Sequence, residues 1–185
     1  LTRRGHTVTV QSGAGVGAAI PDDDYIAAGA AITDDVPALW ADSEMVLKVK
    51  EPIAEEYSFL RPDLLLFTYL HLAADRPLTE ELIAKRVTSI AYETVATASG
   101  ALPLLAPMSE IAGRLAAQVG ADALLRPHGG AGVLLGGAAG VRRGDVVVLG
   151  GGTAGLAAAR VAAGMGANVT VFDIDTAAMR RIEEV

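Results

Sequence analysis

Residues 145–173 read DVVVLGGGTAGLAAARVAAGMGANVTVFD, and this stretch decides the fold. An apolar run is followed by a glycine-rich turn, an alanine-rich segment and a second apolar run. Gly150, Gly152 and Gly155 have the G-x-G-x-x-G spacing directly after the first run. In that context the first glycine permits a tight turn, the second lets a phosphate approach the backbone, and the third lets the helix lie close to the strand. The stretch therefore predicts the βαβ unit of a dinucleotide-binding domain, in which the free N–H groups at the start of the helix bind the phosphates.

The acidic residue that ends the second run narrows the choice of dinucleotide. A carboxylate at the position of Asp173 accepts hydrogen bonds from the adenosine ribose hydroxyls and repels a 2′-phosphate. We therefore predict NAD rather than NADP. FAD-binding and S-adenosylmethionine-binding proteins use related turns, and a plain tight loop is the remaining alternative, so the glycines alone leave the ligand open.

The rest of the chain alternates short apolar runs with stretches of helical period, which is typical of a parallel sheet covered by helices. Strands are predicted at 6–10, 44–50, 64–69, 88–92, 145–150 and 168–173. Helices are predicted to begin at Asp22 and at Thr79, and a third spans 107–120 with an apolar stripe of Ile111, Leu115 and Val119. The glycine-dense stretch 128–145 is expected to be an interdomain loop.

The predicted fold class is α/β, with two Rossmann-like domains that have parallel sheets. Residues 1–104 form the substrate and catalytic domain in this prediction. Residues 105–185 form a linker helix and the first half of the NAD-binding domain, which is incomplete.

The composition argues against several classes of function. The net charge of −7 comes without a cluster of Lys and Arg, which argues against nucleic-acid binding. The absence of cysteine fits the cytoplasm. No run of about 18 apolar residues suggests a membrane span, and the start of the chain lacks a signal peptide. His6 and His128 have no companion at metal-ligand spacing, so no metal site is predicted.

Polar residues follow three of the predicted strands, where ligands of open α/β sheets bind. Lys50 ends one strand, and a lysine there can bind a carboxylate or polarise a carbonyl. His71 follows the next, and histidine exchanges protons at neutral pH. The alternatives are a solvated Lys50 with Lys48 as the functional lysine, and His71 as a core histidine bonded to backbone. Glu93, after the third strand, is interpreted as a helix cap or an interdomain salt bridge.

Five segments in a fixed order resemble the bacterial L-alanine dehydrogenase family. They are LKVKEP (47–52), FTYLHLAA (67–74), IAYETV (90–95), LPLLAPMSEIAGRLAAQVGA (102–121) and the GGGTAG turn. The resemblance implies reversible NAD-dependent conversion of L-alanine to pyruvate and ammonia by a homohexamer. Hydride would leave the alanine Cα for the nicotinamide, and water would add to the resulting iminium. The resemblance makes Lys50 the substrate-binding lysine and His71 the catalytic acid/base, with Ser109, Thr153 and Asp173 as cofactor contacts.

The chain also departs from the family's pattern. The family's substrate-gripping arginine is expected before Leu1 and a catalytic aspartate after Val185, so this 185-residue chain alone is predicted to be inactive. His128, Ala131, Ala139 and Asp175 replace residues that are common in the family, and Ala178 stands where a basic residue is usual.

Two alternatives stay open. The first is the NAD-binding subunit of a proton-translocating transhydrogenase, whose relatives lack the pair of Lys50 and His71. The second is a non-catalytic NAD-binding module.

Overall fold

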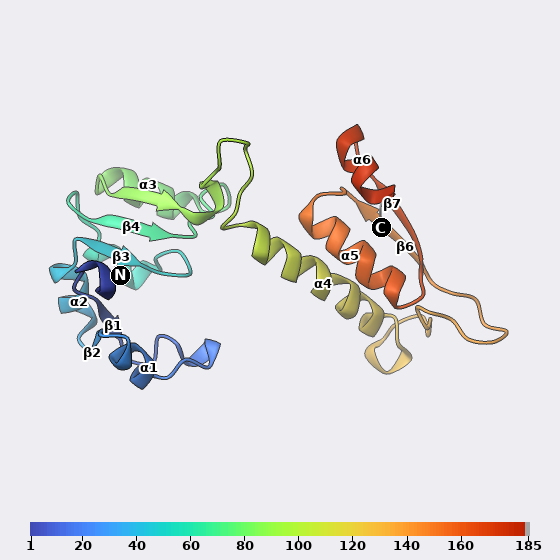
Figure 1. Ribbon diagram of the computed structural model, residues 1–185, viewed down its shortest axis with the longest axis horizontal. Helices are drawn as coiled ribbons and strands as arrows, with labels where there is room; N and C mark the ends of the chain where they lie inside the picture. Colours follow the sequence, from blue (N-terminus) through green and yellow to red (C-terminus); the bar gives the residue numbers. More distant parts are fainter. Residues whose placement is uncertain (184–185) are drawn as a thin grey trace. The chain divides into compact units, whose positions relative to one another are not determined.

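The computed structural model describes residues 1–183 and divides the chain into two compact units, Leu1–Val95 and Ala96–Val185. Each unit is an α/β arrangement with parallel strands, as predicted. Figure 1 shows the order of the elements along the chain. The placement of the domain boundary at 104/105 stays a prediction. Within residues 1–183, none of the helices has both the length and the apolar character that crossing a membrane requires.

The first unit contains a three-stranded parallel sheet in the order β3 (Met45–Leu47), β4 (Leu65–Thr68), β5 (Thr88–Ala91). Helix α3 (Arg76–Ala84) connects β4 to β5. A separate parallel pair, β1 (Thr9–Gln11) and β2 (Ala31–Thr33), is connected by α1 (Asp22–Ala27), and α2 (Val36–Asp42) leads on to β3. Since all three strands of the larger sheet run the same way, their carboxyl ends meet at one edge.

The core of this unit lies around the central strand β4. Leu64, Leu66 and Leu78 are fully buried, and Trp40 packs on Phe59 with ring centroids 5.7 Å apart. The remaining members of the buried cluster are Val46, Leu60, Leu70 and Leu82. Because β4 is covered by α3 and flanked by two strands, its end provides a firm support for the residues that follow it.

Three details of the first unit differ from the prediction. The strands are shorter than the apolar runs, and β2 and α2 were not predicted. Helix α3 begins at Arg76 rather than Thr79, because Asp75 caps it by accepting a hydrogen bond from Leu78 N at 3.0 Å and a proline occupies its first turn. Thr79 lies inside the helix, and its hydroxyl donates to the carbonyl of Asp75.

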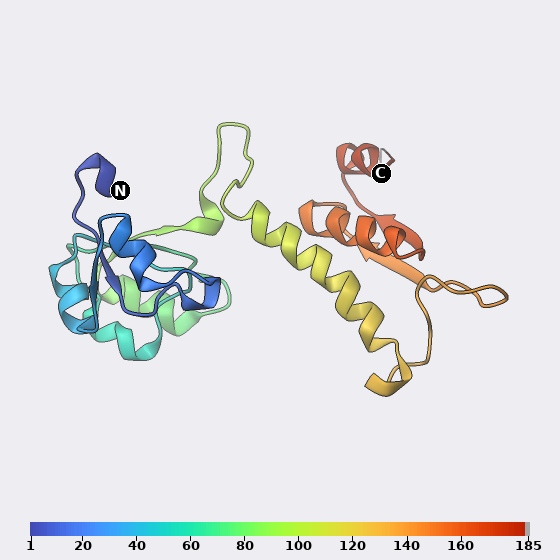
Figure 2. The ribbon, with the colours of Figure 1, turned by 60° about the horizontal axis from the view of Figure 1, so that its bottom comes forward.

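The second unit contains α4 (Ala106–Ala123), β6 (Asp145–Leu149), α5 (Thr153–Gly164), β7 (Asn168–Phe172) and α6 (Thr176–Glu183). Strands β6 and β7 pair in parallel, with Asp145 opposite Asn168. Figures 1 and 2 show α4 alongside α5, with the two strands on the other side of α5. The predicted strand, turn, helix and second strand over 145–173 are thus confirmed.

The close contact between α4 and α5 depends on Gly113, which is buried. A Cβ atom at this position would lie 2.0 Å from the carbonyl oxygen of Ala154, so only glycine fits without a shift of backbone. The predicted apolar stripe lies elsewhere on the helix. Ile111, Leu115 and Val119 are 58%, 52% and 64% exposed, so they do not pack inside the unit, although the helix predicted over 107–120 is present.

The glycine-dense stretch lies within the second unit, and the expectation of an interdomain loop is not what the structure shows. It begins at the last residue of the 3₁₀ turn Arg126–His128 and contains a single antiparallel bridge between Ala138 and Val141. Short 3₁₀ turns also occur in the first unit, at Thr2–Arg4, Val16–Ala18, Ala54–Phe59 and Tyr92–Thr94.

Candidate functional site

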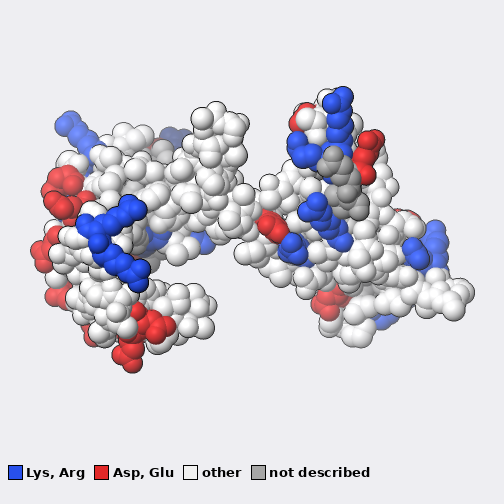
Figure 3. All heavy atoms as spheres, viewed as in Figure 1, with Lys and Arg blue, Asp and Glu red and all other residues white. Residues whose placement is uncertain are grey.

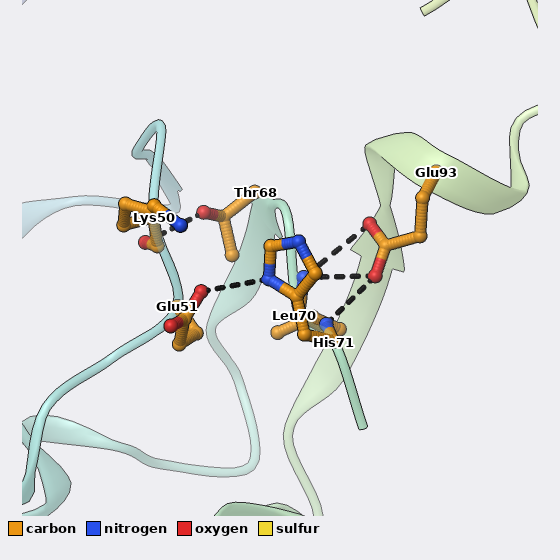
Figure 4. Close-up of polar contacts among 6 residues, drawn as sticks. All are labelled: Lys50, Glu51, Thr68, Leu70, His71 and Glu93. Carbon is orange, nitrogen blue, oxygen red and sulfur yellow. Dashed lines mark hydrogen bonds and ion pairs between the residues drawn. The ribbon is translucent and has the colours of Figure 1, made fainter. Parts of the chain in front are cut away.

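The sequence-predicted residues Lys50, His71 and Glu93 all lie beyond the carboxyl ends of β3, β4 and β5. Figure 4 shows the three loops that carry them converging around His71. The edge of the sheet therefore brings together an ammonium group, an imidazole and two carboxylates, because Glu51 lies beside Lys50 and also contacts His71.

His71 has an unusual backbone conformation. Its φ is 50°, in the left-handed region that side chains other than glycine rarely adopt. The carboxylate of Glu93 accepts hydrogen bonds from His71 N at 2.8 Å and from Leu70 N at 3.1 Å (Figure 4). Burial alone would raise the pKa of Glu93, but the bonds from these backbone N–H groups outweigh it and lower the pKa. The ionised Glu93 carboxylate therefore holds the His71 backbone and is not a helix cap, whereas an interdomain salt bridge from Glu93 stays a prediction.

The imidazole of His71 is held on two sides. Nδ1 lies 2.9 Å from Oε2 of Glu51, and one ring face stacks on Tyr69 with centroids 5.9 Å apart and planes 18° from parallel. The side chain is still 46% exposed. The alternative of a core histidine bonded to backbone is therefore wrong. The partnership with Glu51 was missed by the sequence reasoning, although its position next to Lys50 in the same strand-end loop was an available signal.

The two lysines of LKVKEP have different surroundings. Lys48 forms an ion pair with Glu56, and its ammonium group lies 5.7 Å from the centre of the Trp40 ring, so it has a structural role. Lys50 is exposed, and the structure gives its ammonium group no hydrogen-bond or ion-pair partner among residues 1–183. The buried hydroxyl of Thr68 donates to the Lys50 carbonyl at 2.8 Å, which ties this loop to β4. Of the two, Lys50 is the lysine that is free to bind a ligand.

In the second unit, the glycine turn has the geometry that its spacing predicted. Gly150 has a φ of 100° and donates from its N–H to the carbonyl of Phe172 at 2.7 Å. A Cβ atom on Gly155 would lie 1.8 Å from the carbonyl oxygen of Gly150, so this glycine permits the close approach of helix and turn. A Cβ atom on Gly152 would meet nothing within 4 Å, which leaves the backbone open to a ligand.

Asp173 follows β7 and links this turn to the loop between β7 and α6. Oδ2 accepts a hydrogen bond from Gly151 N at 2.5 Å, and Oδ1 accepts one from Asp175 N at 2.8 Å. The N–H groups of Asp175 and then Gly151 lower the pKa of Asp173. An ionised carboxylate is thus held beside the glycine turn, and each oxygen keeps a lone pair for a further donor.

A hollow of about 460 Å³ adjoins the start of α5. Gly151, Gly152 and Thr153 form one side of it, and Arg160 and Arg181 lie on other sides, together with an Arg114 that pairs with Glu110. Figure 3 shows basic side chains over the α5 and α6 part of this unit, with acidic ones among them. No side chain caps the start of α5, so its backbone N–H groups are available to an anion. Ser109 lies in the first turn of α4, one turn before the Gly113 contact with α5.

Comparison with known proteins decides the family. The model of the alanine dehydrogenase/PNT N-terminal domain matches residues 1–112, and that of the C-terminal domain matches residues 116–185. The chain belongs to the alanine dehydrogenase/PNT family. It is 62% identical over 183 residues to an alanine dehydrogenase of Mycolicibacterium smegmatis, and this match covers 99% of the chain and 49% of the relative. An alanine dehydrogenase of Geobacillus stearothermophilus is 51% identical over 188 residues, with 100% of the chain and 50% of the relative covered. The chain thus spans about half the length of the curated relatives it matches.

Solved structures agree with this family assignment. An L-alanine dehydrogenase superposes with a TM-score of 0.88 at 51% identity, covering 99% of this chain and 50% of that one. A transhydrogenase from Sinorhizobium meliloti superposes with a TM-score of 0.76 at 28% identity, covering 100% of this chain and 55% of that one. The chain is therefore more similar in sequence and in fold to the dehydrogenase.

The departures from the pattern of alanine dehydrogenases fall on the second unit. Ala178, where a basic residue is usual, is a buried residue of α6. Arg181 lies one helical turn later and lines the hollow beside the glycine turn. His128 lies in a 3₁₀ turn, where Nδ1 pairs with Asp122 at 2.9 Å.

Proposed function

We propose that the protein carrying this chain catalyses the reversible, NAD-dependent oxidative deamination of L-alanine to pyruvate and ammonia. The observation that carries the proposal is the sheet edge of the first unit. It combines an unpaired Lys50 ammonium group with an accessible, carboxylate-held His71, in a chain that is 62% identical to an alanine dehydrogenase.

Lys50 and His71 have separate roles in this proposal. The Lys50 ammonium binds a substrate oxygen, because a flexible, compact cation suits a small carboxylate or carbonyl. The imidazole of His71 takes a proton from water as the water oxygen bonds to the imine carbon, and returns it as the carbinolamine releases ammonia. Both groups are supported from β4, because Thr68 holds the Lys50 loop and Leu70 precedes His71.

The residues of the second unit fit a dinucleotide. Gly152 leaves open space for a pyrophosphate, Thr153 begins a helix with free N–H groups, and guanidinium groups line the hollow beside them. Asp173 would accept from the adenosine ribose, which favours NAD over NADP. Ser109, Gly150 and Gly155 complete the proposed cofactor set. When bound, the nicotinamide ring accepts the hydride from the substrate carbon.

The transhydrogenase alternative rests on the superposition with the Sinorhizobium meliloti structure. It gives no role to Lys50 and His71, which is why we rank it second. A cytoplasmic homohexamer is the assembly expected from the resemblance, and sedimentation of the complete gene product measures its size.

Enzyme assays on the complete gene product test the proposal. We expect NADH to form when L-alanine and NAD are supplied, and NADH to be consumed when pyruvate and ammonia are supplied. Lys50→Met should raise the KM for L-alanine by about 100-fold or more, as expected when a charged contact to a carboxylate is lost. Lys85→Met, on an exposed lysine at the end of α3, is the matched control. Hydride exchange between NADH and NADP without any alanine-dependent reaction would favour the transhydrogenase instead.

A further inference from the structure

Glu51 and His71 form a carboxylate–histidine pair at the edge of the first unit's sheet. Oε2 of Glu51 and Nδ1 of His71 are 2.9 Å apart, and the two side chains are 30% and 46% exposed (Figure 4). The two residues come from different loops, after β3 and after β4. Their contact therefore depends on the fold and is not a local consequence of sequence.

The chemistry of the pair fixes one nitrogen of the ring. The N–H group of Glu51 itself, and then the His71 ring, lower the pKa of Glu51, so this carboxylate is ionised at neutral pH. An ionised carboxylate only accepts hydrogen bonds. Nδ1 of His71 must therefore carry the hydrogen in this contact, which leaves the lone pair of the neutral ring on Nε2.

Several contacts together fix the position of the His71 ring. Tyr69 covers one face of the imidazole and is itself buried, with its own ring 5.0 Å from that of Tyr92. The Glu93 carboxylate holds the backbone N–H of His71 in the left-handed conformation. A left-handed conformation is unfavourable for a residue that has a Cβ atom, so the structure retains it at His71 against an energetic penalty. Residues with such unfavourable backbone conformations cluster at functional sites, where a side chain must point in one direction.

We propose that Glu51 is a positioning residue, which holds His71 in the tautomer with hydrogen on Nδ1 so that Nε2 exchanges the proton with substrate. This inference rests on the proposed function and deepens it. As the water oxygen bonds to the imine carbon, Nε2 takes one water proton and the C=N electron pair moves onto the nitrogen. The positive charge that the ring gains faces the Glu51 carboxylate, which stabilises it.

The tautomer can be measured without any activity. In the complete gene product labelled with ¹⁵N-histidine, the long-range ¹H–¹⁵N spectrum of neutral His71 should show hydrogen on Nδ1 and none on Nε2. The signals of His71 are identified as those that disappear in a His71→Gln variant. Glu51→Gln should remove this preference. A wild-type ring with hydrogen on Nε2 overturns the proposal.

Kinetics supply the second test. Glu51→Gln should lower kcat by about 10- to 100-fold, the equivalent of one hydrogen bond to a charged group, while the KM for L-alanine changes little. Glu55→Gln is the matched control, since Glu55 is exposed in the following 3₁₀ turn. Equal kcat values for the two variants would reject the positioning role. If the wild type shows no alanine-dependent NAD reduction, the proposed function fails, and the spectrum still decides the tautomer.

Discussion

Replacing Gly113 with alanine tests the contact between α4 and α5. The added methyl group would lie 2.0 Å from the carbonyl oxygen of Ala154 and 2.8 Å from its carbonyl carbon. Real carbon–oxygen contacts are longer than 3 Å, so the two helices must separate by about 1 Å. Such overpacking costs about 1–3 kcal/mol, and the gain in helix propensity returns about 1 kcal/mol. Because the obstacle is backbone that cannot rotate away, the cost lies in the upper part of this range, about 2–3 kcal/mol, which leaves a net loss of about 1–2 kcal/mol.

Gly120→Ala in the same helix is the matched control. A Cβ atom there would meet nothing within 4 Å, so only the propensity gain of about 1 kcal/mol remains. Urea unfolding of the two variants, followed by the far-ultraviolet signal, gives the difference. Since Ala154 lies in the first turn of α5, Gly113→Ala should also weaken NAD binding measured by calorimetry. A Gly113→Ala protein as stable as the Gly120→Ala protein would refute the steric argument.

Four further predictions address the two units. His71→Ala should lower kcat by about 100- to 10,000-fold, as expected for loss of a general acid/base, and leave the calorimetric affinity for NAD unchanged; a near-normal kcat would remove this assignment. Asp173→Ala should mainly raise the KM for NAD. Because folding lowers the pKa of Asp173, its contribution to stability is complete above the ordinary pKa of about 4 and is lost as the pH falls through the lower folded value. The stability difference between wild type and Asp173→Asn should therefore vanish in acid, and a constant difference across pH would contradict the reasoning. Thr68→Val should cost about 1–3 kcal/mol in urea unfolding, because the Lys50 carbonyl loses its buried donor.

The βαβ unit could be predicted from sequence because each part of it has a local cause. Apolar runs define β6 and β7, and the glycines at 150, 152 and 155 each meet a steric requirement that the structure shows. The candidate positions of Lys50 and His71 followed from a general rule, since ligands of parallel sheets bind beyond the strand ends. Their roles in substrate binding and proton transfer stay predictions.

The parts that sequence did not reveal depend on contacts between distant residues. Glu93 reaches back to His71 across 22 positions, and Glu51 reaches forward to it across 20. The periodicity of apolar residues does not indicate which polar residues, distant in sequence, contact each other in the fold. The stripe of Ile111, Leu115 and Val119 correctly predicted a helix, but an apolar period does not say which face of the helix meets its neighbour, and these three side chains are exposed. In α4 the smallest residue, Gly113, makes that contact.

The left-handed backbone at His71 restricts which residues can replace it. Asparagine tolerates this conformation far better than alanine or any β-branched residue. In a library randomised at this position, the most stable variants should therefore be those with glycine, asparagine or aspartate, whatever their activity. His71→Asn is therefore the preferred inactive variant for experiments that trap bound substrate. It removes the imidazole while the loop after β4 keeps its shape. The same backbone conformation limits which other acidic or basic residues could replace His71 during evolution of this protein.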